Sequence, residues 1–274
     1  MLNILTGVGA RIISNSFLNV FQKILTNEGN KPSAVNFYTY LGLSVLSLCL
    51  IPFFSLNISE TLILCTVIMG ILGALGNYFI IKALSVGDLS SLAPINSYKP
   101  IVALIIAFFW LKEMPSIAAI AGILLIIAGT YLLHGKGFYN RTAVLYRVLA
   151  LIFSGMEAVF IKKIILITNI PTSFALWAFA GLVFSFIFVK ISDNNLKIKD
   201  SKHLLFLIFS VALMQYSTNY VFAKINVSYA LALFQLSTLL SIFLGVNIFK
   251  EKGLKRKIIA SAIMISGAII IILL

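Results

Sequence analysis

Charged residues are scarce in this chain of 274 amino acids, because Asp, Glu, Lys and Arg together make up only 11 % of it. A soluble domain carries about 25 % of these residues, so the chain lacks the charge needed to cover a surface that faces water. Apolar residues reach 61 %, and the mean hydropathy is +1.07. This composition excludes a soluble enzyme, a nucleic-acid-binding domain and a disordered protein. It predicts a protein embedded in a lipid bilayer.

Residues that carry enzyme chemistry are equally few. The chain has eight acidic residues, and its sequence contains no HExxH motif, CxxC motif, paired-carboxylate element or Walker loop. Cys49 and Cys65 lie in apolar segments, which predicts small core residues rather than disulfide partners or metal ligands. The two histidines, His134 and His203, are far apart in the sequence. We therefore predict no metal site, no cofactor and no enzymatic activity, and a membrane-embedded enzyme is the alternative from another class.

Long apolar stretches fill almost the whole chain. A membrane-spanning helix needs about 20 mainly apolar residues. Ten segments meet this requirement: 3–25, 34–54, 60–81, 90–111, 116–133, 143–166, 172–190, 203–223, 229–249 and 256–274. Lipid offers the backbone no hydrogen-bond partners, so apolar segments of this length form helices. The predicted fold is an all-α polytopic membrane protein with ten transmembrane helices.

The second half of the chain repeats features of the first half at an offset of 138 or 139 positions. The matched pairs are Lys23 and Lys162, Pro32 and Pro171, Asn77 and Gln215, Ser90 and Ser228, Lys112-Glu113 and Lys250-Glu251, and Gly129 and Gly267. This offset predicts two five-helix repeats, residues 1–137 and 138–274, within one integral membrane unit. Because five is odd, the second repeat enters the membrane from the opposite side. Inverted repeats are typical of secondary transporters, whose substrate site lies between the halves.

Several short motifs make the whole chain similar to a known family. They are Leu111-Lys112-Glu113 before the fifth helix, Phe249-Lys250-Glu251 before the tenth, Lys82-Ala83-Leu84 leading through Ala93-Pro94 to Pro100, and the late glycines Gly129 and Gly267. With these features the chain resembles the EamA-type branch of the drug/metabolite transporter superfamily. The resemblance implies ten helices in two repeats and a transport activity, and it does not specify a substrate.

Three ionisable residues fall near the centres of predicted helices: Arg11 in the first, Lys99 in the fourth and Glu157 in the sixth. A charge at that depth costs at least about 2.5–3.5 kcal/mol and indicates a functional site. Because one carboxylate cannot neutralise two cations, we predict an anionic or zwitterionic substrate. Arg11 or Lys99 would hold a carboxylate or phosphate, and Glu157 would hold an amino group or a coupling proton. The structural alternative is an ion pair between Glu157 and either cation.

Polar residues accompany these charges. On the first helix, Arg11, Asn15 and Asn19 recur every four residues and share one face, which must point away from lipid. We expect them to line a central polar cavity. The further residues predicted to bind substrate there are Asn77, Tyr78, Asn96, Lys99, Glu157, Gln215, Tyr216 and Gln235. The alternative is hydrogen bonding between helices without contact to a ligand.

Two prolines, Pro94 and Pro100, bracket Lys99 in the fourth predicted helix. A proline inside a helix removes one hydrogen bond and clashes with the preceding turn. We predict that this broken helix acts as a gate, and a static kink is the alternative. The second repeat has Ala232 and Thr238 at the matching positions. The ninth predicted helix therefore has no proline that would predict a break.

These observations together favour a secondary active transporter, working as exporter, importer or exchanger, that moves a small polar organic metabolite by alternating access. An amino acid or related zwitterion ranks first, because both signs of charge occur at mid-depth. The alternatives are a transporter of nucleotide-like or phosphorylated metabolites and a lipid-precursor flippase. The expected partners are the substrate, the bilayer of the inner (plasma) membrane and a coupling proton or counter-substrate. We expect a monomer or homodimer and no nucleic acid.

Basic residues predict how the chain is oriented. Those beside even-numbered connections are Lys112, Lys162, Lys163 and Lys224. The others outside the predicted site, including Arg141 and Arg147, lie beside odd-numbered connections. Since cytoplasmic loops carry the excess of Lys and Arg, this count places both termini outside the cell. The family resemblance implies both termini inside.

Overall fold

The computed structural model describes residues 2–132, 140–192, 196–249 and 257–273, and these ranges are helical apart from short connections. Eight of the predicted spans contain one main helix each: α1 (Leu2–Asn27), α2 (Pro32–Leu48), α3 (Glu60–Val86), α6 (Ile117–Leu132), α7 (Arg141–Ile167), α8 (Ile170–Ser192), α9 (Ser201–Phe222) and α12 (Lys257–Ile272). A short 3-10 helix, η1 (Ile51–Phe53), follows α2, and the fourth and ninth spans are each divided. The predicted all-α polytopic fold with ten spans is confirmed.

Within the described ranges, five helices are long and apolar enough to cross a membrane by length and composition alone. They are Asn3–Asn27, Glu60–Val86, Arg141–Ile167, Ile170–Ile191 and Ser201–Phe222. Shorter apolar helices complete the bundle: Ile95–Trp110, Ile117–Leu132, Val227–Ser241 and Ala262–Ile271. α6 and α12 have 16 residues each, or about 24 Å at 1.5 Å per residue. They therefore come close to the hydrocarbon thickness of a bilayer, about 30 Å.

Local sequence explains where several helices begin. The side-chain oxygens of Ser59, Asn140 and Asp200 accept hydrogen bonds from the first backbone N–H groups of α3, α7 and α9. These N-caps satisfy donors that a helix leaves unpaired. Pro32 stands in the first turn of α2, where no N–H group is needed. The residues before α3, α7 and α9 therefore supply partners for one or two of the first N–H groups of each helix.

The fourth span is broken where its prolines lie. α4 (Leu89–Leu92) passes into the 3-10 helix η2 (Ala93–Tyr98), and α5 (Lys99–Trp110) follows. Pro94 and Pro100 occupy the first turns of η2 and α5, where the missing N–H group is tolerated. Lys99 is therefore the first residue of a new helix, instead of lying in the middle of a continuous one.

The ninth span is also broken, although no proline marks the place. α10 (Val227–Phe234) ends before Gln235, and α11 (Ser237–Phe249) begins two residues later. The backbone N–H of Gln235 donates to the Ala232 carbonyl at 3.0 Å, so the Leu231 carbonyl loses its usual helical donor. The Gln235 side chain replaces that donor, because its Nε2 atom donates to the Leu231 carbonyl at 2.8 Å. A glutamine thus stabilises in the second repeat the kind of break that prolines produce in the first.

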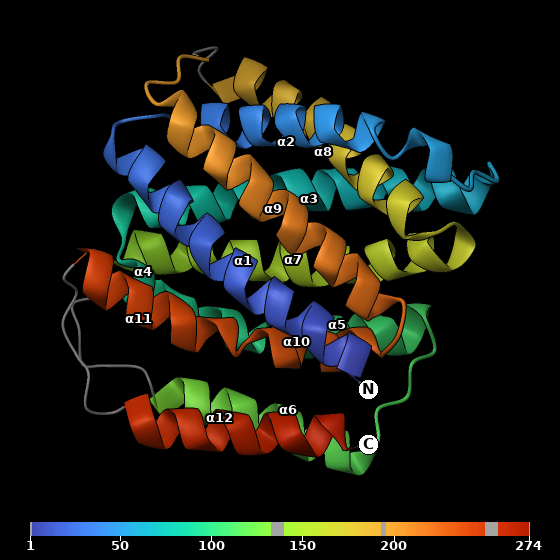
Figure 1. Ribbon diagram of the computed structural model, residues 1–274, viewed down its shortest axis with the longest axis vertical. Coiled ribbons are helices and arrows are strands. Elements are labelled where there is room, and N and C mark those ends of the chain that lie inside the picture. The colour runs from blue at the N-terminus through green and yellow to red at the C-terminus, as the bar shows by residue number, and fades with distance from the viewer. Residues whose placement is uncertain (1, 133–139, 193–195, 250–256, 274) are drawn as a thin grey trace.

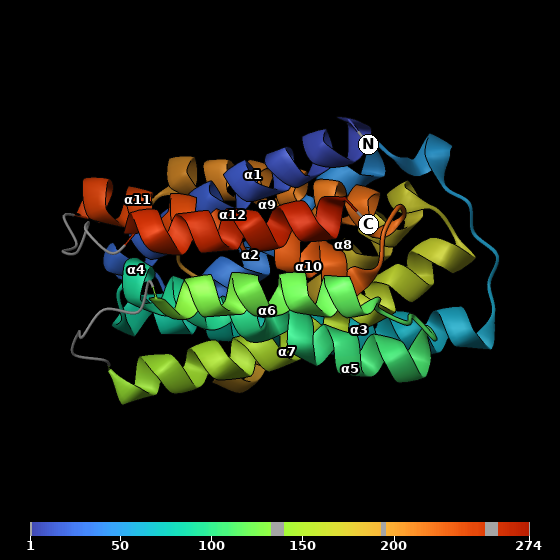
Figure 2. The same ribbon diagram turned by 90° about the horizontal axis from the view of Figure 1, so that it is seen from below.

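Helices of the two halves pack in pairs (Figure 1). α3 lies beside α7, α1 beside α9, α2 beside α8 and α6 beside α12. In the two repeats, α1 corresponds to α7, α2 to α8, α3 to α9 and α6 to α12. The α1–α9 pair therefore corresponds to the α7–α3 pair, and the α2–α8 and α6–α12 pairs each consist of two corresponding helices. This is the two-fold relation of an inverted repeat. Both ends of the chain lie at the same end of the bundle (Figures 1 and 2), as an even number of spans requires.

The α6–α12 pair meets backbone to backbone at two glycines. A Cβ atom on Gly122 would lie 2.8 Å from the Gly267 carbonyl oxygen, and one on Gly267 would lie 2.6 Å from that of Gly122. Small residues allow this close approach between helices in lipid. The main buried apolar core contains side chains from both halves, so the halves are packed as one body.

Candidate functional site

A cavity of about 110 Å³ lies where helices of both halves converge. Side chains from α1, α2, α3, η2, α5, α7, α8, α9 and α10 line it. On α7 the lining extends from Arg147 to Ile161, which is about 21 Å along the helix at 1.5 Å per residue. The cavity is therefore long and narrow, and it runs beside α7.

The fold brings most of the predicted site residues to this cavity. Those that line it are Arg11, Asn15, Asn19, Asn77, Asn96, Lys99, Glu157 and Gln215. Arg11, Asn15 and Asn19 reach it from one face of α1, as their spacing of four residues predicts. The polar face of α1 thus points away from lipid.

Three predicted residues lie outside the lining: Tyr78, Tyr216 and Gln235. Tyr78 stacks on an aromatic ring of α8 with centroids 5.9 Å apart, and Tyr216 is 39 % exposed. Each tyrosine follows a cavity residue by one position, and one step along a helix turns the side chain by about 100°, so both face away. Gln235 is buried at the helix break, where its Oε1 accepts a hydrogen bond from Asn96 at 3.3 Å.

Arg11 enters the cavity from α1 without a counter-ion among the described residues. Its guanidinium lies over the ring of Phe234, 5.0 Å from the centroid. Its Nε and Nη1 atoms are buried and have no hydrogen-bond partner in the described part of the chain. A guanidinium has five donors and does not lose its proton in proteins. An anionic group in the cavity would satisfy these donors.

Glu157 projects from α7 and is held by an aromatic neighbour. The Nε1 atom of Trp177 donates to its Oε1 at 2.5 Å, and Tyr40 packs on Trp177 with ring centroids 5.1 Å apart. The carboxylate lies directly against α3 at Gly73, where a Cβ atom would overlap it. Among the described residues, no Lys or Arg nitrogen lies within 4.0 Å of this carboxylate. The ion pair considered as the structural alternative is therefore not formed.

Arg147 lines the cavity, although the sequence analysis placed it beside a connection between helices. It lies inside α7, is only 5 % exposed and lines the cavity. Its Nε donates to the Leu92 carbonyl at the end of α4 at 3.2 Å. Ten residues separate it from Glu157, which is about 15 Å along the helix. Its depth, six residues beyond Arg141, is the sequence signal that distinguishes it from a loop residue.

Lys99 completes the group of charges. It lines the cavity at the start of α5 and lies within electrostatic range of Glu157, Arg11 and Arg147. The described lining thus contains three cations and one carboxylate. Low-dielectric walls that carry one excess sign of charge concentrate ions of the opposite sign, so this cavity favours anionic groups.

Amide side chains hold much of the wall in place. Gln22 of α1 donates to Asn77 of α3 at 3.1 Å, and Asn77 donates to Asn36 of α2 at 2.5 Å. Asn15 donates to the hydroxyl of Ser237 on α11 at 2.9 Å. The hydrogen bonding between helices that was considered as an alternative is therefore present in the same residues that line the cavity. It fixes the side chains around the space that they enclose.

A buried ion pair joins the two halves near the end of α7. Glu113, in the connection between α5 and α6, lies 3.1 Å from Lys162, and their side chains are 11 % and 10 % exposed. The second carboxylate oxygen of Glu113 accepts a hydrogen bond from the Val227 N–H at 2.9 Å. Lys162 also donates to the Ile225 carbonyl at 2.8 Å. Glu113 thus neutralises Lys162 and caps the start of α10 at the same time.

The symmetry-related lysine lies at the opposite end of the bundle, because α1 and α7 run in opposite directions (Figures 1 and 2). Lys23 of α1 lies 3.7 Å from Asp88, and the Asp88 side chain is 66 % exposed. Water screens such an exposed pair, so it is weaker than the buried one. Lys250 and Glu251, which match Lys112 and Glu113 in the repeat, lie outside the described residues.

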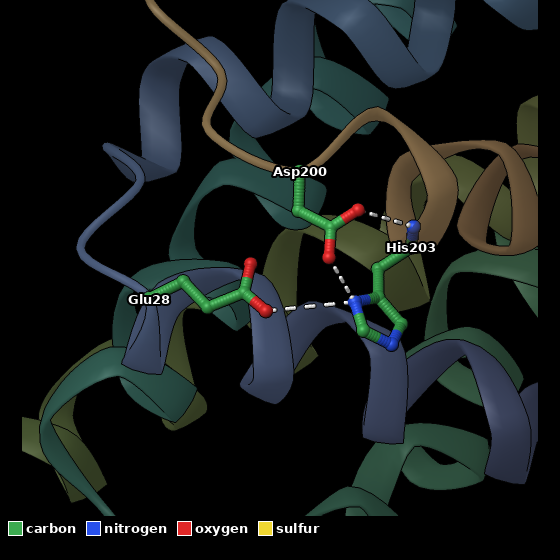
Figure 3. Close-up of side chains that lie close together, drawn as sticks. All are labelled: Glu28, Asp200 and His203. Carbon is green, nitrogen blue, oxygen red and sulfur yellow. Dashed lines mark hydrogen bonds and ion pairs between the residues drawn. The ribbon is translucent and has the colours of Figure 1, made fainter.

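A separate group of ionisable residues lies where α1 ends and α9 begins (Figure 3). The Nδ1 atom of His203 lies 2.5 Å from Oδ2 of Asp200 and 3.5 Å from Oε1 of Glu28. Each residue offers one ligand atom, and the three atoms lie within 4.8 Å of one another. They provide donors that a metal ion accepts, which the sequence does not reveal because Glu28 is far from the other two. The other histidine, His134, lies outside the described residues.

Hydrogen bonds shift the acidity of this group. The backbone N–H of His203, and then its side chain and the backbone N–H of Lys202, lower the pKa of Asp200 below its ordinary value of 3.8. Hydrogen bonds that favour the ionised form have this effect. Asp200 is therefore held as a carboxylate while it caps α9.

Comparisons with known proteins agree with this architecture. The sequence pattern of the EamA-like transporter family matches residues 4–135 and again residues 141–273. Among solved structures, 29 chains match. One of them is a crystal structure described only as that of a protein, and its TM-score against this chain is 0.74. The two sequences are 16 % identical, and the match covers 100 % of this chain and 97 % of the other. An identity this low establishes the fold alone. A search of curated proteins gives no significant match. Because the family pattern covers both halves, the chain belongs to the EamA-like transporter family of membrane proteins.

Proposed function

We propose that this protein is a secondary active transporter that carries a small anionic or zwitterionic metabolite through the central cavity, with an amino acid as the first candidate. The observation that carries the proposal is the meeting of Arg11, Lys99, Arg147 and Glu157 around one cavity between the two halves. An amino acid offers a carboxylate to a guanidinium and an ammonium to Glu157. Charge-assisted hydrogen bonds of both kinds then form together.

Alternating access supplies the transport step. Groups of helices drawn from both repeats, residues 1–137 and 138–274, move relative to one another so that the cavity opens first to one face of the membrane and then to the other. The broken fourth and ninth spans both border the cavity. Pro94 and Pro100 reduce the number of helical hydrogen bonds that bending of the fourth span must break. We therefore assign the gate to this span.

A phosphorylated or nucleotide-like metabolite is the second candidate. It is favoured by the excess of positive charge, since three cations and one carboxylate are found in the described lining. Arginine grips phosphate oxygens in the same bidentate way as a carboxylate. This candidate makes less use of Glu157, which would then serve only to carry a proton.

Energy coupling and placement are part of the same proposal. Glu157 is the acidic residue of the described cavity lining, so it is the group that we assign to a coupling proton, with a counter-substrate as the other source of energy. We place the protein in the inner (plasma) membrane as a monomer or homodimer. The distribution of basic residues favours cytoplasmic odd-numbered connections.

The test is ligand binding followed by transport. We would measure the melting temperature of the purified protein against a panel of amino acids, nucleotides and sugar phosphates, because a specific ligand raises it with the ratio of ligand concentration to Kd. Any hit is then tested for counterflow in proteoliposomes. Arg11→Ala, Lys99→Ala and Glu157→Gln are expected to weaken binding, whereas Lys190→Ala, at an exposed position of α8, is the matched control.

Two results would contradict this proposal in different ways. Unchanged binding of the hit by all three cavity variants would show that the site is elsewhere. Failure of every amino acid and every phosphorylated compound to bind or to be transported would refute the proposed substrate classes.

A further inference from the structure

The two arginines of the cavity carry charges that the described residues do not balance. Arg11 and Arg147 are only 8 % and 5 % exposed. Arg11 has two buried nitrogens without a hydrogen-bond partner in the described ranges, and Arg147 donates its Nε to a neutral carbonyl, that of Leu92. Neither guanidinium forms an ion pair with any residue that the structure describes.

The other two charged groups of the lining balance each other. The charges of Lys99 and Glu157 sum to zero when both side chains are ionised. They also sum to zero when the lysine has given its proton to the carboxylate and both are neutral. A guanidinium does not release its proton. The described lining therefore keeps a charge of +2, from Arg11 and Arg147, in either protonation state of the Lys99–Glu157 pair.

An unbalanced buried charge is costly, so the cavity favours a molecule whose own net charge is negative. We propose that this molecule has two separate anionic groups, one for each arginine. This inference rests on the proposed function and narrows it, because among amino acids only the acidic ones carry a second anionic group. With a net charge of −1, an acidic amino acid lowers the charge of the occupied cavity from +2 to +1, whereas its neutral amide leaves it at +2. Arg147 then becomes the residue that determines specificity.

The arrangement assigns a place to each group of an acidic amino acid. Arg11, with its unsatisfied donors, takes one carboxylate, and the ammonium faces Glu157. The second carboxylate points along the cavity toward Arg147 and Lys99, whose charges attract it across the low-dielectric lining. Lys99 lies within electrostatic range of both arginines and of Glu157, so all four charges act on one cavity of about 110 Å³, a size suited to one small molecule.

The experiment compares ligands that differ by one charge and almost nothing else. The full-length protein in lipid nanodiscs is titrated at low ionic strength with L-aspartate against L-asparagine and L-glutamate against L-glutamine. Each acid is expected to bind roughly 30-fold or more tightly than its amide, as for a close buried charge pair. The variant Arg147→Gln should lower the affinity for the acid to that for the amide and leave the amide within about threefold of its original affinity.

Two further variants separate charge from structure. Arg147→Lys keeps the charge and should retain most of the preference for the acid. Arg141→Gln removes a charge from an exposed position at the start of the same helix, and it should change nothing. The melting temperature of each variant without ligand shows whether it is folded, and Arg147→Lys keeps the test decisive if Arg147→Gln does not fold.

The outcomes distinguish this inference from the proposed function. Equal affinity for acid and amide, still abolished by Arg11→Ala, would leave an amino acid transporter and overturn the acidic class. A preference for the acid that persists unchanged in Arg147→Gln would overturn the role of Arg147. Saturation of the same stabilisation by chloride alone would show that two simple anions balance the arginines, and binding of none of the four amino acids would refute both statements.

Discussion

The buried ion pair between Glu113 and Lys162 offers the most direct test of the architecture. We consider Lys162→Met, which removes the cation but keeps a side chain of similar length. The Glu113 side chain is 11 % exposed, so solvent screens little of its charge, and only the Val227 N–H remains to bind it. Removing one partner of a buried pair costs about 3–5 kcal/mol. We expect a loss of unfolding free energy of that size.

The double variant makes this reasoning sharper. Glu113→Gln combined with Lys162→Met leaves no buried charge, and the glutamine oxygen still accepts the hydrogen bond that caps α10. Replacing both members of a buried pair is often nearly neutral. We therefore expect the double variant to be more stable than Lys162→Met alone, with a coupling energy of about 2 kcal/mol or more.

The assay is equilibrium unfolding in mixed detergent micelles, followed by tryptophan fluorescence and helical circular dichroism. Lys163→Met is the matched control, because Lys163 is the next residue of α7 and forms no ion pair within 4.0 Å among the described residues. If Lys162→Met were no more destabilising than Lys163→Met, or if the double variant lost the sum of the single effects, the pair would not stabilise the fold as argued.

Three further predictions address the cavity wall, the helix break and the start of α9. Gly73→Ala places a methyl group against the carboxylate of Glu157, so it should weaken ligand binding at least about tenfold, about 1.4 kcal/mol, and unchanged affinity in a titration would refute this contact. Gln235→Leu leaves a carbonyl of α10 unpaired and should cost about 1–3 kcal/mol in the same unfolding assay, and an unchanged free energy of unfolding would refute the role of the Gln235 side chain at the break. Asp200 has a lowered pKa in the folded state, so its contribution to stability is present above pH 3.8 and is lost as the pH falls through the folded value. Melting temperatures of Asp200→Asn should therefore depend less on pH below about 4 than those of the wild type, and parallel curves would contradict the role of the His203 N–H.

Much of the fold was predictable because it depends on the length of the apolar segments, the internal repeat and the spacing of polar residues. Apolar length identified the ten spans, since a bilayer requires about 20 such residues per helix. The offset between the halves, seen in Lys23 and Lys162, identified the repeat. The spacing of Arg11, Asn15 and Asn19 identified the polar face of α1, because 3.6 residues per turn place them on one side. Each of these inferences needs only the order of residues along the chain.

Other features were hidden from the sequence for a common reason. Arg147 has the same residue type as Arg141, at the exposed start of the same helix, and its hydrogen bond to the Leu92 carbonyl shows that it faces inward. The break at Gln235 has no proline, because a side-chain amide supplies the missing donor. Tyr78 and Tyr216 were expected in the cavity, yet a rotation of one residue turns them away.

For this protein, the amino-acid sequence by itself determined that the chain crosses a membrane ten times in two inverted halves and that a few charges lie at mid-depth. Hydropathy, helical period and internal offset can all be read from the order of residues along the chain, and they suffice for that. Only the tertiary structure decided which charges share one cavity, that Glu157 meets Trp177 instead of a cation, and that two arginines remain unbalanced among the described residues. Those facts depend on contacts between helices far apart in the chain, whose distances are set by packing.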